Sequence, residues 1–271
     1  ILDTKLNKGD FVLFQNEINV DGANEIIEGA VKRGLFVIIN PAPCPSNILN
    51  TLPNIKLAQV IVVNESEAFS IFQQLESSKM SIQSELDILE RFKQGNLKGQ
   101  GLIDFAKKLG LLILNSFSNS YIVCITLGGD GSVLAIRNQS NSTGVVSTHI
   151  IPCLKHVKIV DTTAAGDTYV GYFVAGLMKH ADSFLRINQT GELEVYNNTV
   201  TSSEPKHEQV LTETLSMELI AVESAKLASV AGGVACETKG ALNSIPKFQS
   251  VLDRHDHGAF WRLIHQKSIK H

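Results

Sequence analysis

Short runs of apolar, often β-branched residues alternate along the chain with longer stretches in which apolar residues recur every three or four positions. Four of the short runs are predicted to be buried strands, at 11–15, 36–40, 58–63 and 121–127. The longer stretches predict amphipathic helices over 21–32, 65–75 and 102–117. Continuous apolar strands separated by helices are typical of a mostly parallel sheet that is covered on both faces. The pattern therefore predicts an α/β fold of layered type.

The second half of the chain continues this alternation. A glycine-rich turn at 128–131 is expected to join the strand at 121–127 to another strand at 132–136. Helical spacing then returns over 169–178, 217–236 and, near the end of the chain, 260–265. In the second of these helices the small residues that share one face predict close packing against a neighbour; they are Ala221, Ala225, Ala228 and Ala231.

Two stretches depart from the pattern. Residues 77–100 are strongly charged, and residues 181–212 are rich in Asn, Thr, Ser and Glu with little apolar periodicity. Both are interpreted as surface insertions. With them set aside, residues 1–271 are predicted to form a single domain, which their length allows.

Composition narrows the classes of function. The chain is 44% hydrophobic and carries a formal net charge of -3, so no general attraction to nucleic acid or to an anionic membrane is expected. Its four cysteines lie far apart and show neither zinc-ligand spacing nor a dense disulfide framework. No apolar run reaches the ~18 residues of a membrane span, and no signal-peptide pattern opens the chain. We therefore expect a cytoplasmic protein that acts on small molecules; a nuclear presence stays open.

The segment with the clearest chemistry runs from Asp161 to Thr168 and leads directly into the helix predicted over 169–178. The small residues at 164–166 allow backbone amides to converge at a helix N-terminus, where free N–H groups and the helix dipole favour an anion. Asp167 then lies beside this site as a carboxylate that can accept a proton from an attacking hydroxyl. A simpler interpretation stays open, in which Asp167 caps the helix and Gly166 relieves crowding.

The full string Asp161-Thr-Thr-Ala-Ala-Gly-Asp167 resembles the anion-hole signature of the ribokinase-like, or PfkB, carbohydrate kinase family. Other pieces follow in the family's order; they are Asn40-Pro41-Ala42-Pro43, Asn64-Glu65-Ser66-Glu67, the stretch 126–131 and the stretch 240–246. The resemblance covers nearly the whole chain apart from the two insertions and the tail. It implies a three-layer α/β/α ribokinase-like fold and phosphorylation of a sugar by ATP. The Ala-Ala-Gly form and the Asn-Pro-Ala-Pro string favour D-ribose, giving D-ribose 5-phosphate.

The resemblance also implies roles for individual residues. Asp167 would be the catalytic base, with amides of Ala164, Ala165 and Gly166 as donors to the transferred phosphoryl group. The sugar would contact Glu17 and Asp167. Residues that would line ATP are Asn64, Thr126, Gly128, Gly131 and Gly166. Glu67 would act through water on Mg²⁺. A K⁺ site would comprise Asp161, Thr163, Ala235, Thr238, Gly240 and Ser244.

Several alternatives stay open at this point. Glu67 also fits a carboxylate that merely favours the start of its own helix, and Glu17 has no independent support. Members of the family begin with a sugar-binding segment and a small β-lid, for which residues 1–271 show no counterpart. That N-terminal part is expected to be absent here, which leaves sugar binding and a homodimer of the full-length protein open. Another PfkB sugar or nucleoside kinase, or a non-catalytic nucleotide-binding remnant, are the rival interpretations.

Overall fold

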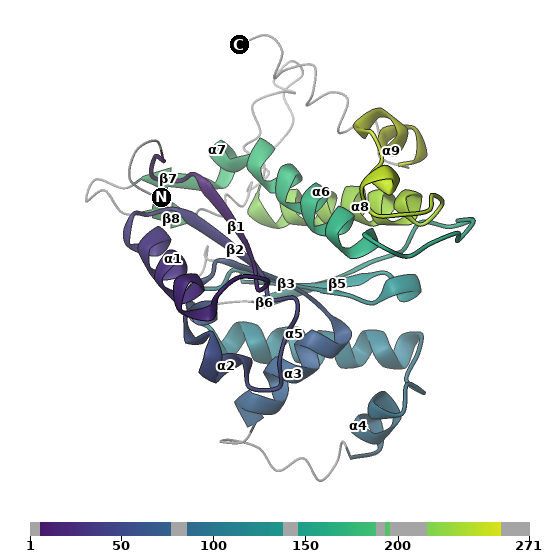
Figure 1. Cartoon of the computed structure of the whole chain (residues 1–271), viewed down its shortest axis with the longest axis horizontal. Helices are drawn as coiled ribbons and strands as arrows, with labels where there is room; N and C mark the ends of the chain where they lie inside the picture. Colours follow the sequence, from purple (N-terminus) through teal and green to yellow (C-terminus); the bar gives the residue numbers. More distant parts are fainter. Residues whose placement is uncertain (1–5, 77–85, 138–145, 188–192, 196–215, 256–271) are drawn as a thin grey trace, which may run out of the picture.

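One six-stranded sheet lies between two layers of helices (Figure 1). The structure is a computed structural model that describes residues 6–76, 86–137, 146–187, 193–195 and 216–255. The strands follow chain order across the sheet: β1 (Phe11–Gln15), β2 (Phe36–Asn40), β3 (Val60–Asn64), β4 (Ile122–Thr126), β5 (Ser132–Arg137) and β6 (Val146–Ile151). Neighbours from β1 to β4 pair in parallel, whereas β5 runs antiparallel to both β4 and β6. This confirms the predicted mostly parallel sheet and three-layer fold.

The helices divide between the two faces of the sheet (Figure 1). One face carries α1 (Val20–Lys32), α2 (Ile48–Thr51), α3 (Glu65–Glu76), α4 (Leu86–Lys93) and α5 (Gln100–Ser116). The other face carries α6 (Ala165–Lys179), α8 (Met217–Ala235) and α9 (Phe248–Arg254). A short helix α7 (Ala181–Phe184) leads into a separate antiparallel hairpin of β7 (Leu185–Ile187) and β8 (Leu193–Val195). None of the helices in the described ranges is both long and apolar enough to cross a membrane.

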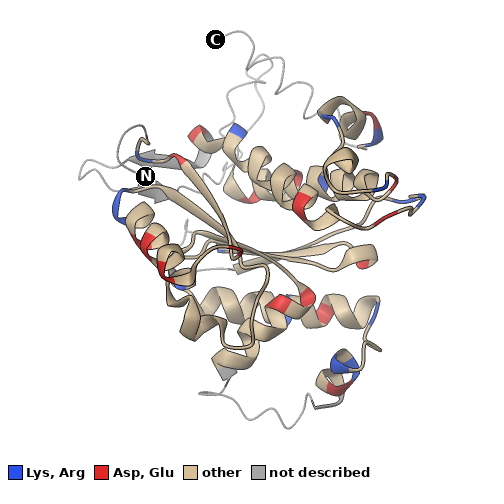
Figure 2. Cartoon of the chain, in the orientation of Figure 1, with Lys and Arg blue, Asp and Glu red and all other residues tan. Residues whose placement is uncertain are grey.

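The central strands β2 to β5 are buried on both faces, which explains their continuous apolar sequences. In β2, Phe36 and Ile38 pack with α6 and α8, while Val37 and Ile39 pack with the helices of the opposite layer. All four side chains are fully buried, as the alternation of side chains along a strand requires when each face is covered. Charged side chains are correspondingly rare in the sheet (Figure 2). Arg137 is the one Lys, Arg, Asp or Glu residue in β1 to β6.

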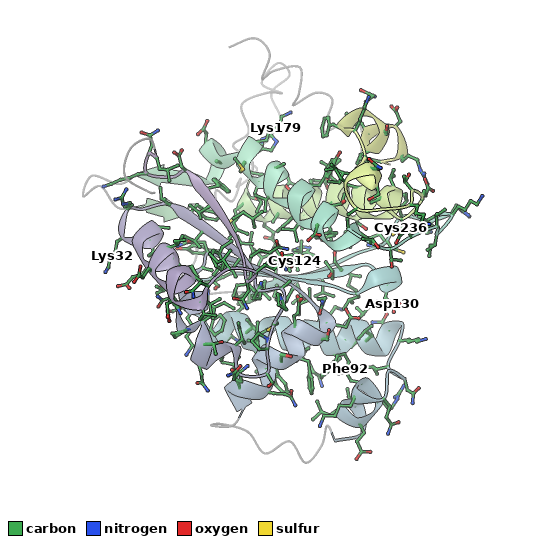
Figure 3. The ribbon with its side chains drawn as sticks, viewed as in Figure 1. Lys32, Phe92, Cys124, Asp130, Lys179 and Cys236 are labelled. Atoms are coloured by element: carbon green, nitrogen blue, oxygen red, sulfur yellow. The ribbon has the colours of Figure 1, made fainter. Side chains whose placement is uncertain are left out.

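Helix α6 is held close to α8 and to the sheet. A side chain at Gly176 would overlap Ser224 of α8, because its Cβ would lie 2.5 Å from the Ser224 Oγ. The predicted alanine face of α8 is confirmed, because Ala221, Ala225, Ala228 and Ala231 are all completely buried. Towards the sheet, the Tyr169 hydroxyl of α6 lies 2.8 Å from Ser132 Oγ and 3.4 Å from Cys124 Sγ, at the centre of the molecule (Figure 3). Small residues and one buried polar contact therefore set the position of α6.

The predicted surface insertion over residues 77–100 is partly helical and packed on the core in its described part, 86–100. That stretch contains α4, and Leu89 and Leu97 are buried in the core. Phe92 of α4 also packs on Phe69 and Phe105, with ring centroids 4.9 and 5.2 Å away. The apolar residues of this stretch are few and lie among charged ones, so the composition of the segment concealed the face that packs.

The structure adds elements that the sequence did not predict, and some predicted segments lie outside the described residues. Strand β6 was not expected. Its Ser, Thr and His residues lie at partly exposed positions, and they interrupt the apolar run. Residues 181–187 and 193–195, within the predicted insertion at 181–212, form α7 and the β7–β8 hairpin. The rest of that insertion and the helix predicted at 260–265 lie outside the described residues.

The turn between β4 and β5 requires glycine at position 131 in particular. Gly131 has φ of +92°, and a Cβ there would lie 2.1 Å from the carbonyl oxygen of Ile151. Neighbouring Gly129 has no atom within 4 Å of its Cβ position and is not among the residues with positive φ. The backbone conformation and the close Ile151 carbonyl thus require glycine at position 131, next to the point where β6 pairs with β5.

Replacing Gly131 with alanine should destabilise the protein by more than about 2 kcal/mol, because a strained φ and a clash with backbone combine. Gly129→Ala is the matched control and should change the free energy of unfolding by less than about 0.5 kcal/mol. Urea unfolding of the two variants measures the difference. Equal stabilities would contradict this assignment of the turn.

Candidate active site at the carboxyl ends of the parallel strands

Each of the four parallel strands ends in a polar residue. Gln15 and Asn40 are opposite each other at the ends of β1 and β2, and Asn64 is opposite Thr126 at the ends of β3 and β4. Ligands of open α/β sheets bind at this carboxyl edge. Sequence reasoning had selected Asn64 and Thr126 but not Gln15. The signal was available, since each residue closes an apolar run.

The N-terminus of α6 presents free backbone donors at this edge. Helical hydrogen bonding begins with Thr168 N donating to Ala164 O at 2.8 Å, so the N–H groups of Gly166 and Asp167 have no acceptor within the helix. Gly166 is exposed, and a Cβ placed there would meet no atom within 4 Å. The space and the free amides suit an anion. Of the predicted donors, Ala165 donates its N–H to Thr162 O at 3.2 Å in this structure.

Ala164 starts this helix in an unusual conformation. Its φ of +62° is left-handed, and no side chain caps the helix. Such a conformation costs a residue with a Cβ roughly 1 to 2 kcal/mol. Strain of this kind recurs at functional sites, where the surrounding structure maintains it.

Asp167 lies on the first turn of α6, exposed to solvent. Its Oδ1 accepts a hydrogen bond from Gln15 Nε2 at 3.1 Å, a contact between residues 152 positions apart. Among the described residues no other side chain donates to this carboxylate. Asp167 is therefore fixed beside the free amides of its own helix, with one oxygen unoccupied.

Asn64 and Glu67 form a reciprocal cap at the start of α3. The Asn64 side chain accepts from the Glu67 amide at 2.8 Å, and Glu67 Oε2 accepts from the Asn64 amide at 2.9 Å. This is the structural role that the sequence had left open for Glu67. Burial raises the pKa of the Glu67 carboxyl, although the Asn64 amide opposes the shift. The second oxygen of Glu67 has no hydrogen-bond partner in the part of the chain described, so the water-mediated contact with Mg²⁺ stays a prediction.

Asp161 ties together the two loops that were expected to hold K⁺. Its Oδ1 accepts from the amide and hydroxyl of Thr163 at 2.9 and 2.7 Å, and its Oδ2 accepts from the amide of Gly240 at 2.9 Å. Chiefly the Thr163 hydroxyl, and then the two amides, lower the pKa of Asp161 to about 2. The carboxylate is therefore ionised at neutral pH.

The other predicted members of that set lie along the second loop. The amide of Thr238 donates to the carbonyl of Ala235 at 3.2 Å, and the buried Ser244 hydroxyl donates to Ala241 O at 2.7 Å. The structure thus brings the segments around 161 and 240 together. Within the described ranges, no group of three or more His, Cys, Asp and Glu side chains is arranged to hold a metal ion.

The remaining predicted residues flank this centre. Gly128 has φ of +54° and open space at its Cβ position, which fits a backbone that a ligand approaches. Glu17 is exposed, and no contact joins it to Asp167 in the described residues. Its neighbour Asn16 instead anchors the loop after β1, donating its amide to Ala42 O at 3.2 Å and its side chain to Pro43 O at 2.8 Å. The sugar contact of Glu17 stays a prediction.

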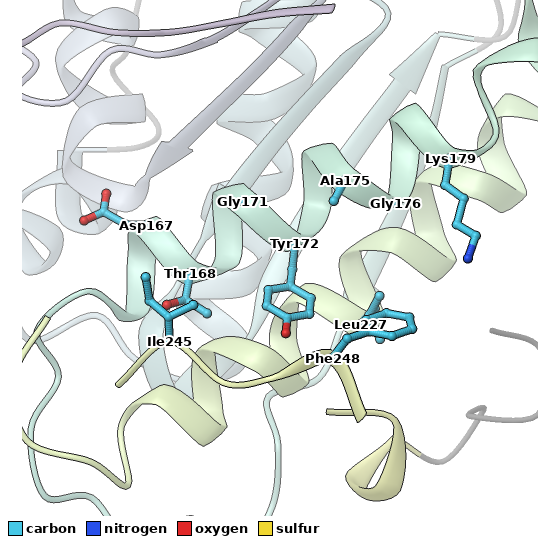
Figure 4. Close-up of a pocket in the computed structure, with 10 residues that line it drawn as sticks. All are labelled: Asp167, Thr168, Gly171, Tyr172, Ala175, Gly176, Lys179, Leu227, Ile245 and Phe248. Carbon is cyan, nitrogen blue, oxygen red and sulfur yellow. The ribbon is translucent and has the colours of Figure 1, made fainter. Parts of the chain in front are cut away.

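A groove of about 500 Å³ runs along α6 away from Asp167 (Figure 4). Asp167 lies at one end and Lys179 at the other, with Tyr172 and Phe248 between them. The Lys179 Nζ lies 5.9 Å from the centre of the Phe248 ring, and burial lowers the pKa of this lysine. The remaining lining residues are Thr168, Gly171, Ala175, Gly176, Leu227 and Ile245.

Part of the chain matches a family of known proteins. Residues 107–191 match the pfkB family carbohydrate kinase family. The chain is 30% identical over 207 residues to a ribokinase of Staphylococcus aureus (strain COL), an alignment that covers 74% of this chain and 55% of the relative. The chain thus spans about half the length of that relative.

Solved structures share the fold. A ribokinase from Giardia lamblia superposes with a TM-score of 0.57 at 22% identity, covering 90% of this chain and 58% of the other. A ribokinase from Cryptococcus neoformans var. grubii serotype A superposes with a TM-score of 0.56 at 22% identity, covering 94% and 64%. Residues 107–191 thus match the pfkB family of carbohydrate kinases, and the chain is similar to ribokinases in sequence and in fold.

Proposed function

We propose that the protein to which this chain belongs transfers the terminal phosphoryl group of ATP to D-ribose, giving D-ribose 5-phosphate. One observation carries the proposal: the Asp161–Asp167 string folds into a helix N-terminus whose free amides lie beside the Asp167 carboxylate. That combination supplies a proton acceptor and an anion site at one point. The Staphylococcus aureus relative, at 30% identity, is a ribokinase, which supports ribose as the acceptor.

Asp167 and the α6 amides have separate tasks in this reaction. The free oxygen of Asp167 would accept the proton of the attacking sugar hydroxyl. The N–H groups of Gly166 and Asp167 would donate to the oxygens of the phosphoryl group, on which negative charge spreads in the transition state. Ala164 and Ala165 would complete the turn that aims these donors. Little covalent chemistry is needed, since positioning and charge stabilisation account for most of the catalysis.

The nucleotide would lie along the ends of β3 and β4. The Cryptococcus ribokinase structure is a complex with ADP, and the open space at Gly128 and Gly166 is consistent with a nucleotide close to the backbone. We assign Asn64, Thr126, Gly128, Gly131 and Gly166 to this role. Mg²⁺ would neutralise phosphate charge when bound, with Glu67 holding one of its waters.

The K⁺ site is proposed for the two loops that Asp161 joins. A solved structure of Escherichia coli phosphofructokinase-2, with a TM-score of 0.55 at 14% identity, contains potassium. The set here would be one carboxylate and oxygen atoms of the loops, from Asp161, Thr163, Ala235, Thr238, Gly240 and Ser244. Oxygen ligands suit a hard cation. A cation bound there would stiffen the turn that precedes the anion site.

The alternative function is transfer of the phosphoryl group to an acceptor other than D-ribose, and one solved structure supports it. An aminoimidazole riboside kinase from Salmonella enterica shares the fold with a TM-score of 0.52 at 16% identity. Consumption of ATP by the intact protein with D-ribose, D-fructose or adenosine, in Mg²⁺ and K⁺, separates the cases. D-Ribose should give the highest kcat/KM. Equal values for the three acceptors would contradict the ribose assignment.

Asp167→Asn should lower kcat by roughly 10²- to 10⁴-fold, because the proton acceptor is lost while the size of the side chain is kept. The affinity for ATP should stay within about threefold, since the amides of α6 remain. Steady-state kinetics and calorimetric ATP binding measure the two effects. Asp104→Asn, an exposed carboxylate on α5, is the control and should leave both unchanged. Loss of ATP binding in Asp167→Asn would show that the residue is misassigned.

Asp161→Ala should loosen the contact between the loops at 161–163 and 236–240, because the Gly240 and Thr163 amides lose their common acceptor. Backbone hydrogen bonds from Val160 and Asp161 to Cys236 O remain. Hydrogen exchange of the Gly240 amide should accelerate, and turnover should become equally fast in K⁺ and Na⁺. In the parent protein K⁺ should support the higher rate. Asp10→Ala removes a comparable contact, in which Asp10 Oδ2 accepts from the Asn7 amide at 2.8 Å, and should preserve the preference for K⁺. A variant of Asp161 that keeps this preference would contradict the site.

A further inference from the structure

Gln15 is the residue that holds the Asp167 carboxylate. It is the last residue of β1, and its Nε2 donates to Asp167 Oδ1 at 3.1 Å. Asp167 is exposed on the first turn of α6, and no other described side chain donates to it. The rotamer of the carboxylate therefore depends on this one contact across the edge of the sheet.

The orientation of the Gln15 amide is set by Asn40 on the neighbouring strand. Asn40 is 7% exposed, and its Nδ2 donates to the carbonyl of Val62 in β3 at 2.8 Å. Its Oδ1 is thereby turned towards β1, where Gln15 Nε2 lies 3.4 Å away. Two acceptors, Asn40 Oδ1 and Asp167 Oδ1, both face the Gln15 side chain, so the end of the amide that points at them is the NH₂ group.

This chain of amides starts from a buried strand and ends on the candidate base. An NH₂ group has two hydrogens, and here one is directed at Asn40 and the other at Asp167. Oδ1 of Asp167 is occupied as a result, while Oδ2 has no partner among the described residues. A carboxylate with one oxygen held and one free presents a defined acceptor to a substrate hydroxyl.

We propose that Gln15 is a positioning residue, which fixes the Asp167 carboxylate so that Oδ2 faces the hydroxyl of the acceptor sugar. This inference rests on the proposed function, in which Asp167 is the base. In this role Gln15 acts through Asp167 and not directly on the reacting hydroxyl or the phosphoryl group. Its effect should therefore appear in kcat rather than in the binding of ATP.

The test uses Gln15→Met and Gln15→Glu in the intact protein. Methionine keeps the length of the side chain but cannot donate, and an ionised glutamate has no N–H and adds a like charge beside Asp167. Each variant should lower kcat with D-ribose roughly 10- to 100-fold, as expected for a misplaced catalytic group. KM for ATP should change less than about threefold, and the melting temperature should stay close to that of the parent.

A double-mutant cycle separates positioning from a general structural effect. Once Asp167 is replaced by asparagine, adding Gln15→Met should lower kcat by less than about twofold further, because the group that Gln15 positions is gone. Gln100→Met is the matched control, since Gln100 Nε2 donates to Asp104 Oδ1 at 2.9 Å on α5, in the same kind of contact. It should leave kcat unchanged.

The outcomes distinguish this inference from the proposed function. A parent protein that phosphorylates none of the acceptors overturns both. An active parent with unchanged kcat in Gln15→Met overturns the role of Gln15 alone, and so do fully additive effects in the cycle. If both Gln15 variants fail to fold, the residue is structural and the proposal is equally overturned.

Discussion

The close packing of α6 against α8 and the sheet is the constraint on which the candidate site depends. Gly176 allows the two helices to approach until its backbone and Ser224 are in contact. Ala221, Ala225 and Ala228 of α8 share one buried cluster with apolar residues of α6. Tyr169 holds α6 against the sheet through a hydrogen bond between its hydroxyl and that of Ser132 in β5. A helix held in this way delivers its N-terminus, with its free amides, to the ends of the parallel strands. Bulkier residues in either layer would move the anion site away from the sheet.

The residues that make the site also hold its local structure. Asn64 and Glu67 cap α3. Asp161 accepts two hydrogen bonds from Thr163 in its own loop and one from the Gly240 amide in the second loop. Such double use keeps polar side chains in place before any ligand binds, which lowers the cost of ordering them during catalysis. It also explains why a structural interpretation was available for Glu67 in the sequence. The two interpretations are compatible, because the cap uses only one of its carboxylate oxygens.

Much of the fold followed from local patterns. The strand at 36–40 was predicted with its observed limits. Four apolar residues followed by one polar residue, in a short run between helices, favour a buried strand. Edge strand β6 and helix α4 were missed, because their few apolar residues lie among polar ones. In α4 the decisive information is the partner: Phe92 counts as a core residue only when Phe69 and Phe105 are seen beside it.

The sequence by itself determined the family signature, the parallel layered architecture and the identity of Asp167 as a candidate base. These features are encoded within short windows, where apolar spacing and a single string of seven residues suffice. The tertiary structure alone decided what surrounds that base. Gln15 meets Asp167 across 152 positions, through an amide whose orientation is set by Asn40 on another strand. No local pattern can encode such a contact, because it arises only when the sheet register and the position of α6 are both established.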